Sequence, residues 1–198
     1  NVATGAGTLT LGGNVTFTAT NNPLGSTISG NLNLGSATRT FTIGDSTGAA
    51  DDLTITAIIS GTGGLTKAGA GKLTLSGNNT YSGTTTLSAG TLRATTSANA
   101  LGAGALSLGG GTLELANDTA LNFGRNTTVT AATTIKSDRL TSGAAVTHTL
   151  GTLSQGAFAL TGAAGTNVAS GTAGIDFGTA TFTGAPTFSP GTGFQFGL

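Results

Sequence analysis

One short string places a hydroxyl beside a carboxylate, as a serine nucleophile would require. The string is Gly44-Asp45-Ser46-Thr47-Gly48. Such a nucleophile needs a histidine within hydrogen-bond reach and a third group that orients the histidine. The chain has one histidine, His148, which lies in the strand-like segment Val146-Thr147-His148-Thr149-Leu150. We interpret the first string as a turn in which an aspartate side chain caps the backbone, and we predict that the chain is not an enzyme.

Carboxylates elsewhere do not form a pattern that indicates metal binding or acid–base catalysis. Asp51-Asp52 lies near Asp45, but calcium-binding β-rolls repeat Gly-Gly-x-Gly-x-Asp, and that repeat is missing from this sequence. We therefore interpret Asp51-Asp52 as a solvated loop. Glu114 and Asp118 are too isolated for an acid–base pair. Because there is one histidine and no cysteine, we expect no metal and no cofactor.

The composition indicates short strands joined by tight corners. Charged residues make up 7% of the chain, 35 of the 198 residues are Gly, and Thr is the commonest residue. Thr fits a pleated surface and Gly fits tight turns. Seven basic residues balance seven acidic ones, so we expect no nucleic-acid partner. No apolar run is long enough for a membrane-spanning helix.

Apolar–polar–apolar triplets such as Leu73-Thr74-Leu75 and Leu113-Glu114-Leu115 recur along the chain. Side chains at i and i+2 of a strand point to one face, so each triplet predicts a short strand with one buried face. Equivalent positions form two ladders: Leu11, Leu34, Ile55, Leu75, Ala94, Leu115 and Ile135, and Ile43, Leu65, Leu87, Leu108, Val129 and Leu150. Both ladders share one period along the chain.

That period predicts an all-β fold, a right-handed parallel β-helix (β-solenoid) with about 20–22 residues per turn. Each strand would stack about 4.8 Å from its equivalent in the preceding turn. We expect residues 1–198 to form a single β-solenoid domain. Disorder and chance alignment of Leu and Thr are the alternatives, and the regular spacing of the apolar residues argues against both.

Residues 58–115 carry a more specific pattern, and residues 58–94 read IISGTGGLTKAGAGKLTLSGNNTYSGTTTLSAGTLRA. This stretch resembles the autotransporter-associated β-strand repeat, also called the passenger-associated transport repeat. The matching residues are Gly61, Gly63, Gly64, Leu65, Lys67, Gly69, Gly71, Leu73, Leu75, Gly77, Asn79, Thr80, Tyr81, Gly83, Thr85, Gly90, Thr91 and Leu92. The stretch from Leu101 to Leu113 resembles the strand pair that often follows the repeat.

The resemblance implies a right-handed parallel β-helix that is displayed on, or released from, a bacterial surface. In that family the repeat takes part in export and not in a reaction. We therefore expect an extracellular or bacterial cell-surface location. Within the motif, we expect Asn78-Asn79 to form a turn and Tyr81 to cap a corner with its hydroxyl in water.

The segment 140–198 is poor in charge and rich in Phe, with Asp176 as its one formally charged residue. Six of the nine phenylalanines lie there: Phe158, Phe177, Phe182, Phe188, Phe194 and Phe196. Phe158, Phe177 and Phe196 are equally spaced, which predicts a stacked aromatic column. We predict that the six residues serve self-assembly, because apolar strands with few charges lack protection against edge pairing. The alternative is a thicker terminal part of the core.

Three roles fit these observations. The favoured role is a non-enzymatic extracellular structural protein, a surface or fibre subunit that associates into homo-oligomers or filaments, because zero net charge leaves no long-range repulsion between copies. The alternative is a monomeric autotransporter-passenger stalk or adhesin module that contacts cell surfaces or matrix. A third is a polysaccharide-binding or polysaccharide-cleaving β-helix. An aromatic-lined groove would then be expected, and one Tyr with no Trp argues against it.

Overall fold

The computed structural model describes residues 1–20 and 22–198, which fold into 23 strands. Every strand pairing within this part of the chain is parallel. The same residues contain no helix with the length and hydropathy needed to cross a membrane. Parallel pairing between successive strands requires the chain to wind in one sense, so the fold is an all-β parallel solenoid, as the sequence predicts.

Two long sheets form the two main faces. The ten-stranded sheet contains β1 (Val2–Thr10), β3 (Ser26–Asn33), β5 (Leu53–Ile55), β6 (Ile58–Ser60), β8 (Lys72–Leu75), β10 (Thr91–Thr95), β12 (Thr112–Ala116), β14 (Thr133–Asp138), β18 (Ala159–Ala164) and β22 (Thr187–Pro190). The eight-stranded sheet contains β2 (Val15–Phe17), β4 (Arg39–Ile43), β7 (Leu65–Ala68), β9 (Thr85–Leu87), β11 (Leu106–Leu108), β13 (Thr127–Val129), β17 (Leu153–Gln155) and β21 (Ala180–Phe182).

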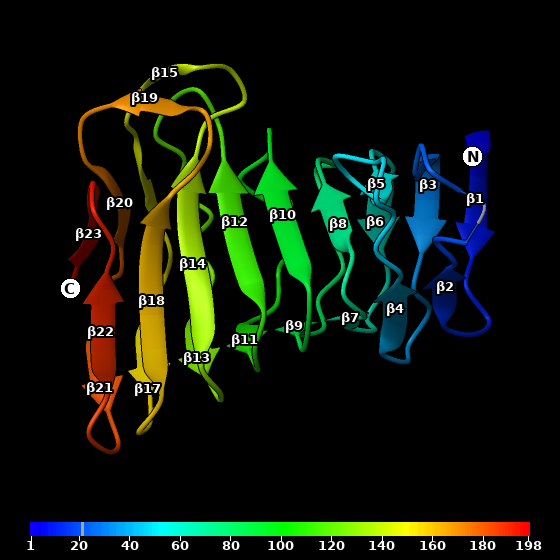
Figure 1. Cartoon of the computed structure of the whole chain (residues 1–198). Coiled ribbons are helices and arrows are strands. Elements are labelled where there is room, and N and C mark those ends of the chain that lie inside the picture. The colour runs from blue at the N-terminus through cyan, green and yellow to red at the C-terminus, as the bar shows by residue number, and fades with distance from the viewer. Residues whose placement is uncertain (21) are drawn as a thin grey trace.

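Two small sheets are confined to the C-terminal half. One contains β16 (Thr147–Thr149), β20 (Ala173–Asp176) and β23 (Phe194–Gly197), and the other pairs β15 (Gly143–Ala144) with β19 (Val168–Ser170). Figure 1 shows the strands of the ten-stranded sheet side by side from β1 at the N-terminal end to β22 at the C-terminal end, with β15 and β19 projecting beyond the ends of the main strands.

The central coils are short and regular. From β7 to β14 the chain alternates between the two long sheets. Lys72 pairs with Thr91, Thr91 with Thr112 and Thr112 with Thr134. These partners are separated along the chain by close to the predicted coil length. The predicted period is therefore confirmed in the centre of the molecule.

The coils on either side are longer. Thr27 pairs with Thr54 and Thr134 with Thr161, and both separations exceed the predicted period by about a quarter. On the C-terminal side the extra residues form β15, β16, β19 and β20, which lie between the two long sheets along the chain. On the C-terminal side, the longer coils thus add a third face to the solenoid.

This change of coil length shifts both apolar ladders. Ile55 pairs with Ile28 and not with Leu34, because the intervening coil is longer than the predicted period. Leu115 pairs with Ser137, whereas Ile135 pairs with Leu113. The predicted ladder steps from Leu34 to Ile55 and from Leu115 to Ile135 are therefore wrong in register.

The second ladder also fails, at one step because a coil is shorter than the predicted step and at another because a coil is longer. Leu87, Leu108 and Val129 are paired as predicted. Leu65, however, pairs with Thr85, the inward residue that precedes Leu87 in β9, and Leu87 pairs with Lys67. Leu150 follows β16 on the third face, and so lies outside the eight-stranded sheet.

The core consists of columns of inward side chains between the two long sheets. Leu73, Leu92, Leu113 and Ile135 are consecutive partners, and each is fully buried. Burying one such side chain contributes about 1.5–3 kcal/mol. Because the buried positions repeat once per coil, each coil stabilises its two neighbours.

Candidate functional site: a charged groove on the ten-stranded sheet

The outer face of the ten-stranded sheet collects charged side chains over its central strands. Arg93 of β10 pairs with Glu114 of β12, and Glu114 pairs with Lys136 of β14. Lys72 of β8 lies in a neighbouring row and pairs with Thr91. Side chains on one face of a strand alternate with inward ones, so the buried Leu column sets these charges outward.

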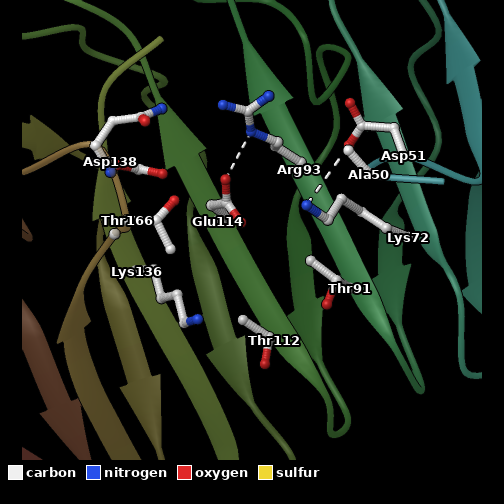
Figure 2. Close-up of a pocket in the computed structure, with 12 residues that line it drawn as sticks. Ala50, Asp51, Lys72, Thr91, Arg93, Thr112, Glu114, Lys136, Asp138 and Thr166 are labelled. Atoms are coloured by element: carbon white, nitrogen blue, oxygen red, sulfur yellow. Dashed lines mark hydrogen bonds and ion pairs between the residues drawn. The ribbon is translucent and has the colours of Figure 1, made fainter. Parts of the chain in front are cut away.

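These side chains line a groove with a volume of about 330 Å³. Six of the fourteen charged residues of the chain lie in it, three acidic and three basic. Figure 2 shows the lining residues, most of them on the strands β8, β10, β12 and β14. The lining residues are Ala50, Asp51, Lys72, Thr91, Arg93, Thr112, Glu114, Lys136, Asp138, Gly165, Thr166 and Asn167.

Two ion pairs satisfy most of the charge in the groove. Arg93 Nε donates to Glu114 Oε1 over 2.6 Å, and both side chains are more than four-fifths buried. Lys72 Nζ lies 3.6 Å from Asp51 Oδ1. Dashed lines in Figure 2 mark both pairs.

Lys136 differs from the other two cations, because its ammonium forms no ion pair with any described carboxylate. Its cross-strand neighbour Glu114 is used by Arg93. The Asp138 carboxylate instead accepts the Asn167 backbone N–H at 2.9 Å and is buried. Among the described residues, Lys136 is the groove cation without an ion pair and Asp138 the groove carboxylate without one, and of the two only Lys136 is partly exposed.

A periodic signal for this groove is present in the sequence. Asp51, Lys72, Arg93, Glu114 and Lys136 follow one another at almost constant spacing, close to the length of a central coil. In a solenoid of that period, residues with this spacing lie on one face. The period therefore predicts the groove when it is applied to the charged residues, whereas the apolar ladders alone do not.

The residues considered for nucleophilic catalysis are not brought together. Ser46 Oγ donates to the Asn22 carbonyl at 2.9 Å, near the N-terminal end. His148 lies in β16 on the third face, where its Nδ1 accepts the Leu121 N–H at 3.2 Å and its Nε2 lies 3.1 Å from the Asp138 carbonyl. Both ring nitrogens are thus used by backbone groups.

The carboxylate that caps the Ser46 backbone belongs to Asp52 and not to Asp45 of the predicted turn. Its carboxylate accepts the N–H groups of Ser46 at 2.6 Å and of Lys72 at 2.7 Å. Asp52 is 2% exposed. The prediction that Asp51-Asp52 is a solvated loop is therefore wrong for Asp52, which ties the corner after β4 to the strand β8.

Glu114 and Asp118 also interact with different parts of the chain. Glu114 forms an ion pair with Arg93. Asp118 accepts the N–H groups of Leu140 and Thr141 at 3.0 and 2.9 Å and the Thr141 hydroxyl at 2.9 Å. The backbone N–H of Thr141 is the main reason that the pKa of Asp118 is lowered.

Tyr81 and Lys67 of the recognisable repeat are buried in the core. The Tyr81 hydroxyl lies 2.6 Å from Thr85 Oγ1, and the residue is 0% exposed. The prediction that this hydroxyl remains in water is therefore wrong, and burial raises its pKa. Lys67 occupies an inward position in β7, as Leu65 does, and its ammonium donates to the carbonyls of Ala68, Gly69 and Ala89 at 2.8–3.0 Å.

The predicted aromatic column is also wrong. Phe196 pairs with Ile175 and not with Phe177, and Phe158 precedes β18 in the ten-stranded sheet. The spacing of the three phenylalanines is shorter than the coils on this side of the molecule, in which Thr127 pairs with Leu153. Four of the six phenylalanines instead form a chain of edge-to-face contacts, with ring centroids 5.0–5.6 Å apart: Phe182, Phe188, Phe196 and Phe194.

Comparison with known proteins agrees with this architecture. Residues 65–94 match the family model described as the passenger-associated-transport-repeat. A similar curated protein is the adhesin BmaC autotransporter of Brucella suis, which is 44% identical over 132 residues. That match covers 63% of this chain and 4% of the relative, so the chain spans a small part of the protein it resembles. No solved structure matches.

The matched residues 65–94 begin with β7 and end within β10. They therefore lie within the short, regular coils in the centre of the solenoid. These coils also carry Lys72 and Arg93 of the groove. The comparisons indicate an extracellular or cell-surface location. The chain is a parallel β-solenoid that contains a passenger-associated transport repeat at its centre and is similar in sequence to part of an autotransporter adhesin.

Proposed function

We propose that the chain is a non-enzymatic structural segment of an adhesive surface passenger. The observation that carries this proposal is the unbroken parallel stacking of the ten-stranded sheet from β1 to β22. Nine stacked levels at about 4.8 Å give a rod on the order of 40 Å long. Such a rod holds its outward side chains at fixed spacing, as a surface that contacts cells or matrix requires.

The similarity to an adhesin autotransporter supports the adhesive part of the proposal. The residues considered for catalysis or metal binding support a structural role, because the partners of Ser46, His148 and Asp52 are backbone groups. A side chain that serves the backbone in this way stabilises a corner. We therefore assign these residues to folding.

An in-frame deletion of residues 1–198 in the producing bacterium tests the proposal. We expect the shortened passenger to remain detectable on the cell surface by its sensitivity to added protease, and adherence of intact bacteria to epithelial cells to fall. A matched deletion of equal length elsewhere in the passenger controls for length. If adherence does not change, the adhesive role is rejected.

A second proposal is self-association through the Phe-rich segment 140–198. Phe158 and Phe182 are 40% and 44% exposed, and Phe182 belongs to the aromatic chain that includes Phe188. Exposed aromatic rings next to a strand edge with few charges favour pairing with a second copy. On this proposal Phe158, Phe177, Phe182, Phe188, Phe194 and Phe196 belong to, or support, the contact.

Sedimentation velocity across a range of micromolar concentrations tests self-association. We expect the native chain to form oligomers or filaments and the double variant F158S/F182S to remain monomeric. Filaments should show a ~4.8 Å repeat along their axis. Monomers of the native chain at every concentration would reject this proposal and leave the passenger role unaffected.

A further inference from the structure

We propose that the charged groove over β8, β10, β12 and β14 binds an acidic saccharide, a sugar chain that carries carboxylate or sulfate groups. The inference deepens the proposed surface role by naming a ligand class, and it rests on that role for its biological setting. The binding itself depends on the groove alone. It is therefore testable on the purified chain.

The partly exposed charges of the groove favour an anionic ligand, because its three cations are partly exposed whereas Glu114 and Asp138 are buried. Asp51 and Glu114 are each paired with a cation, and Asp138 is held by the Asn167 N–H. Lys136 keeps an ammonium that no described carboxylate pairs. The Arg93 contact to Glu114 uses Nε, which leaves the two terminal nitrogens of a planar fork suited to a carboxylate or sulfate.

The remaining groups favour a saccharide over a protein segment. Thr91, Thr112 and Thr166 bring hydroxyl groups to the groove lining. The described lining includes no aromatic and no large aliphatic side chain, whereas protein interfaces depend on buried aromatic and apolar anchors. The same described lining also lacks the aromatic rings expected of a groove for neutral polysaccharides, so hydroxyls and charges must provide the recognition, which restricts the ligand to a charged saccharide.

The geometry suits an extended chain. The four strands are neighbours in the ten-stranded sheet, and three spacings of about 4.8 Å separate the first from the last. Lys72, Arg93 and Lys136 therefore lie at increasing heights along roughly 14 Å of the solenoid axis. A linear ligand parallel to this axis would meet Arg93 and Lys136 in one row, with Lys72 in the row beside it.

Non-specific attraction does not account for such binding, because the chain has zero net charge. A polyanion is not drawn to a neutral protein as a whole. Any affinity must come from a local arrangement of cations. Salt should weaken it, because the groove is open to solvent.

Calorimetric titration with defined hexasaccharides tests the proposal. The ligands are a heparin hexasaccharide, which is sulfated, a hyaluronan hexasaccharide, which has carboxylates alone, and neutral maltohexaose. We expect the chain to bind at least one acidic sugar and not maltohexaose. In K136Q we expect the affinity to fall about fivefold, the upper range for one exposed charge contact, with an unchanged circular dichroism spectrum.

The double variant K136Q/T128K is the matched control. Thr128 is an exposed residue of β13 on the other long sheet, so this variant restores the net charge but not the groove. We expect it to bind as weakly as K136Q. Native-like binding by the double variant, equal binding of maltohexaose, or tighter binding of a glutamate hexapeptide would each overturn the proposal. These outcomes leave the adherence test of the proposed function unaffected.

Discussion

Buried polar side chains shape the corners of this solenoid. Thr85 Oγ1 donates to the Leu101 carbonyl at 2.8 Å and also contacts the Tyr81 hydroxyl. The Asn79 amide connects the Ile59 N–H to the Ala100 carbonyl, one coil on each side. A buried polar group is costly when it lacks a partner. Each of these residues therefore fixes the corner that provides its partners.

Gly102 lies against the Tyr81 ring and has a φ of +75°. A Cβ there would lie 2.5 Å from the ring. We expect Gly102→Ala to lower the free energy of unfolding by about 2 kcal/mol or more, through overpacking and backbone strain. Gly12→Ala is the control, since nothing lies within 4 Å of the place that its Cβ would take. Thermal melts that show equal losses in both variants would contradict this account.

Lys67 acts as an internal donor for the corner between β7 and β8. Lys67→Met keeps most of the side-chain volume and removes the donor to three carbonyls. We expect the variant to lose about 1–3 kcal/mol, and Lys67→Ala to lose more because a cavity is added. Urea denaturation measures both. A fully stable Lys67→Met would show that these hydrogen bonds contribute nothing net.

The Lys67 amine should also resist chemical modification. Burial lowers its pKa to about 8, and the nearby Asp52 opposes that shift. The side chain is nevertheless fully buried, so access and not basicity controls its reactivity. The two groove lysines, Lys72 and Lys136, are more open to solvent. Mass spectrometry after brief acylation should find them modified first, and early modification of Lys67 would contradict its burial.

His148 makes stability depend on pH. Burial lowers its pKa below the ordinary value, while the Asp138 backbone and charge oppose that shift. The unfolded chain therefore takes up a proton first as the pH falls. The contribution of neutral, buried His148 to the free energy of unfolding is complete above about pH 6.5 and is lost progressively below it. Denaturant titrations from pH 8 to pH 5 measure this loss.

The chain has one histidine, which simplifies the control. His148→Gln removes the group that titrates in this window. We expect its free energy of unfolding to be nearly flat between pH 7 and pH 5, below the range in which Lys67 titrates, although lower overall. An equally steep pH dependence in the variant would assign the effect to another group.

At the scale of elements, the conformation of the segment that follows β14 and carries β15 depends on Asp118. Arg139 Nη1 donates to the Asp118 and Ala144 carbonyls at 2.8 and 3.0 Å, and the Asp118 carboxylate caps Leu140 and Thr141. This group of contacts fixes the chain where it leaves β14. The β15 strand then pairs with β19 of the next coil.

Asp118→Ala should destabilise the segment between β14 and β15 without unfolding the long sheets. We expect faster amide hydrogen exchange at Leu140 and Thr141, because their acceptor is removed, and unchanged exchange in β10 and β12. Asp45→Ala, at an exposed acidic residue, is the control. Faster exchange throughout the molecule would mean that Asp118 stabilises the whole solenoid.

Sequence periodicity predicts the elements well where coil length is constant. Leu73, Leu92 and Leu113 repeat at intervals close to the predicted period, so their stacking follows from spacing alone. The transitions to longer coils near Ile55 and Asp138 could not be predicted in this way. Extra residues in a coil carry no apolar period that reveals which sheet they join.

The candidate site was predictable only in part. The inward position of Lys67 follows from alternation with Leu65, although a charged residue is not expected in a core. The groove has a clear period in its charges, but the choice of Arg93 over Lys136 as the partner of Glu114 depends on side-chain conformation. Sequence spacing places residues on a face and does not assign their partners.

At the scale of the whole molecule, stability comes from contacts between neighbouring coils. A deletion that matches the period should therefore be tolerated. Removing residues 91–111 deletes β10 and β11 and brings β8 against β12 and β9 against β13. We expect a folded chain with cooperative thermal unfolding and a moderately lower Tm.

The matched control removes half a coil. Deleting residues 91–100 takes out β10 and leaves β11, so the two long sheets can no longer stay in register. We expect loss of cooperative unfolding by circular dichroism. Similar behaviour of the two deletions would argue against coil-by-coil stacking as the source of stability.

Parallel stacking of the coils also has a mechanical consequence. Hydrogen bonds between coils run along the solenoid axis, so a pulling force applied between its ends loads them in series and opens one coil at a time. Each central coil, at about 20 residues, would release about 65–70 Å of slack. A surface rod of this kind absorbs tension in small, repeated steps, and it shortens again when the load is removed and the coils restack.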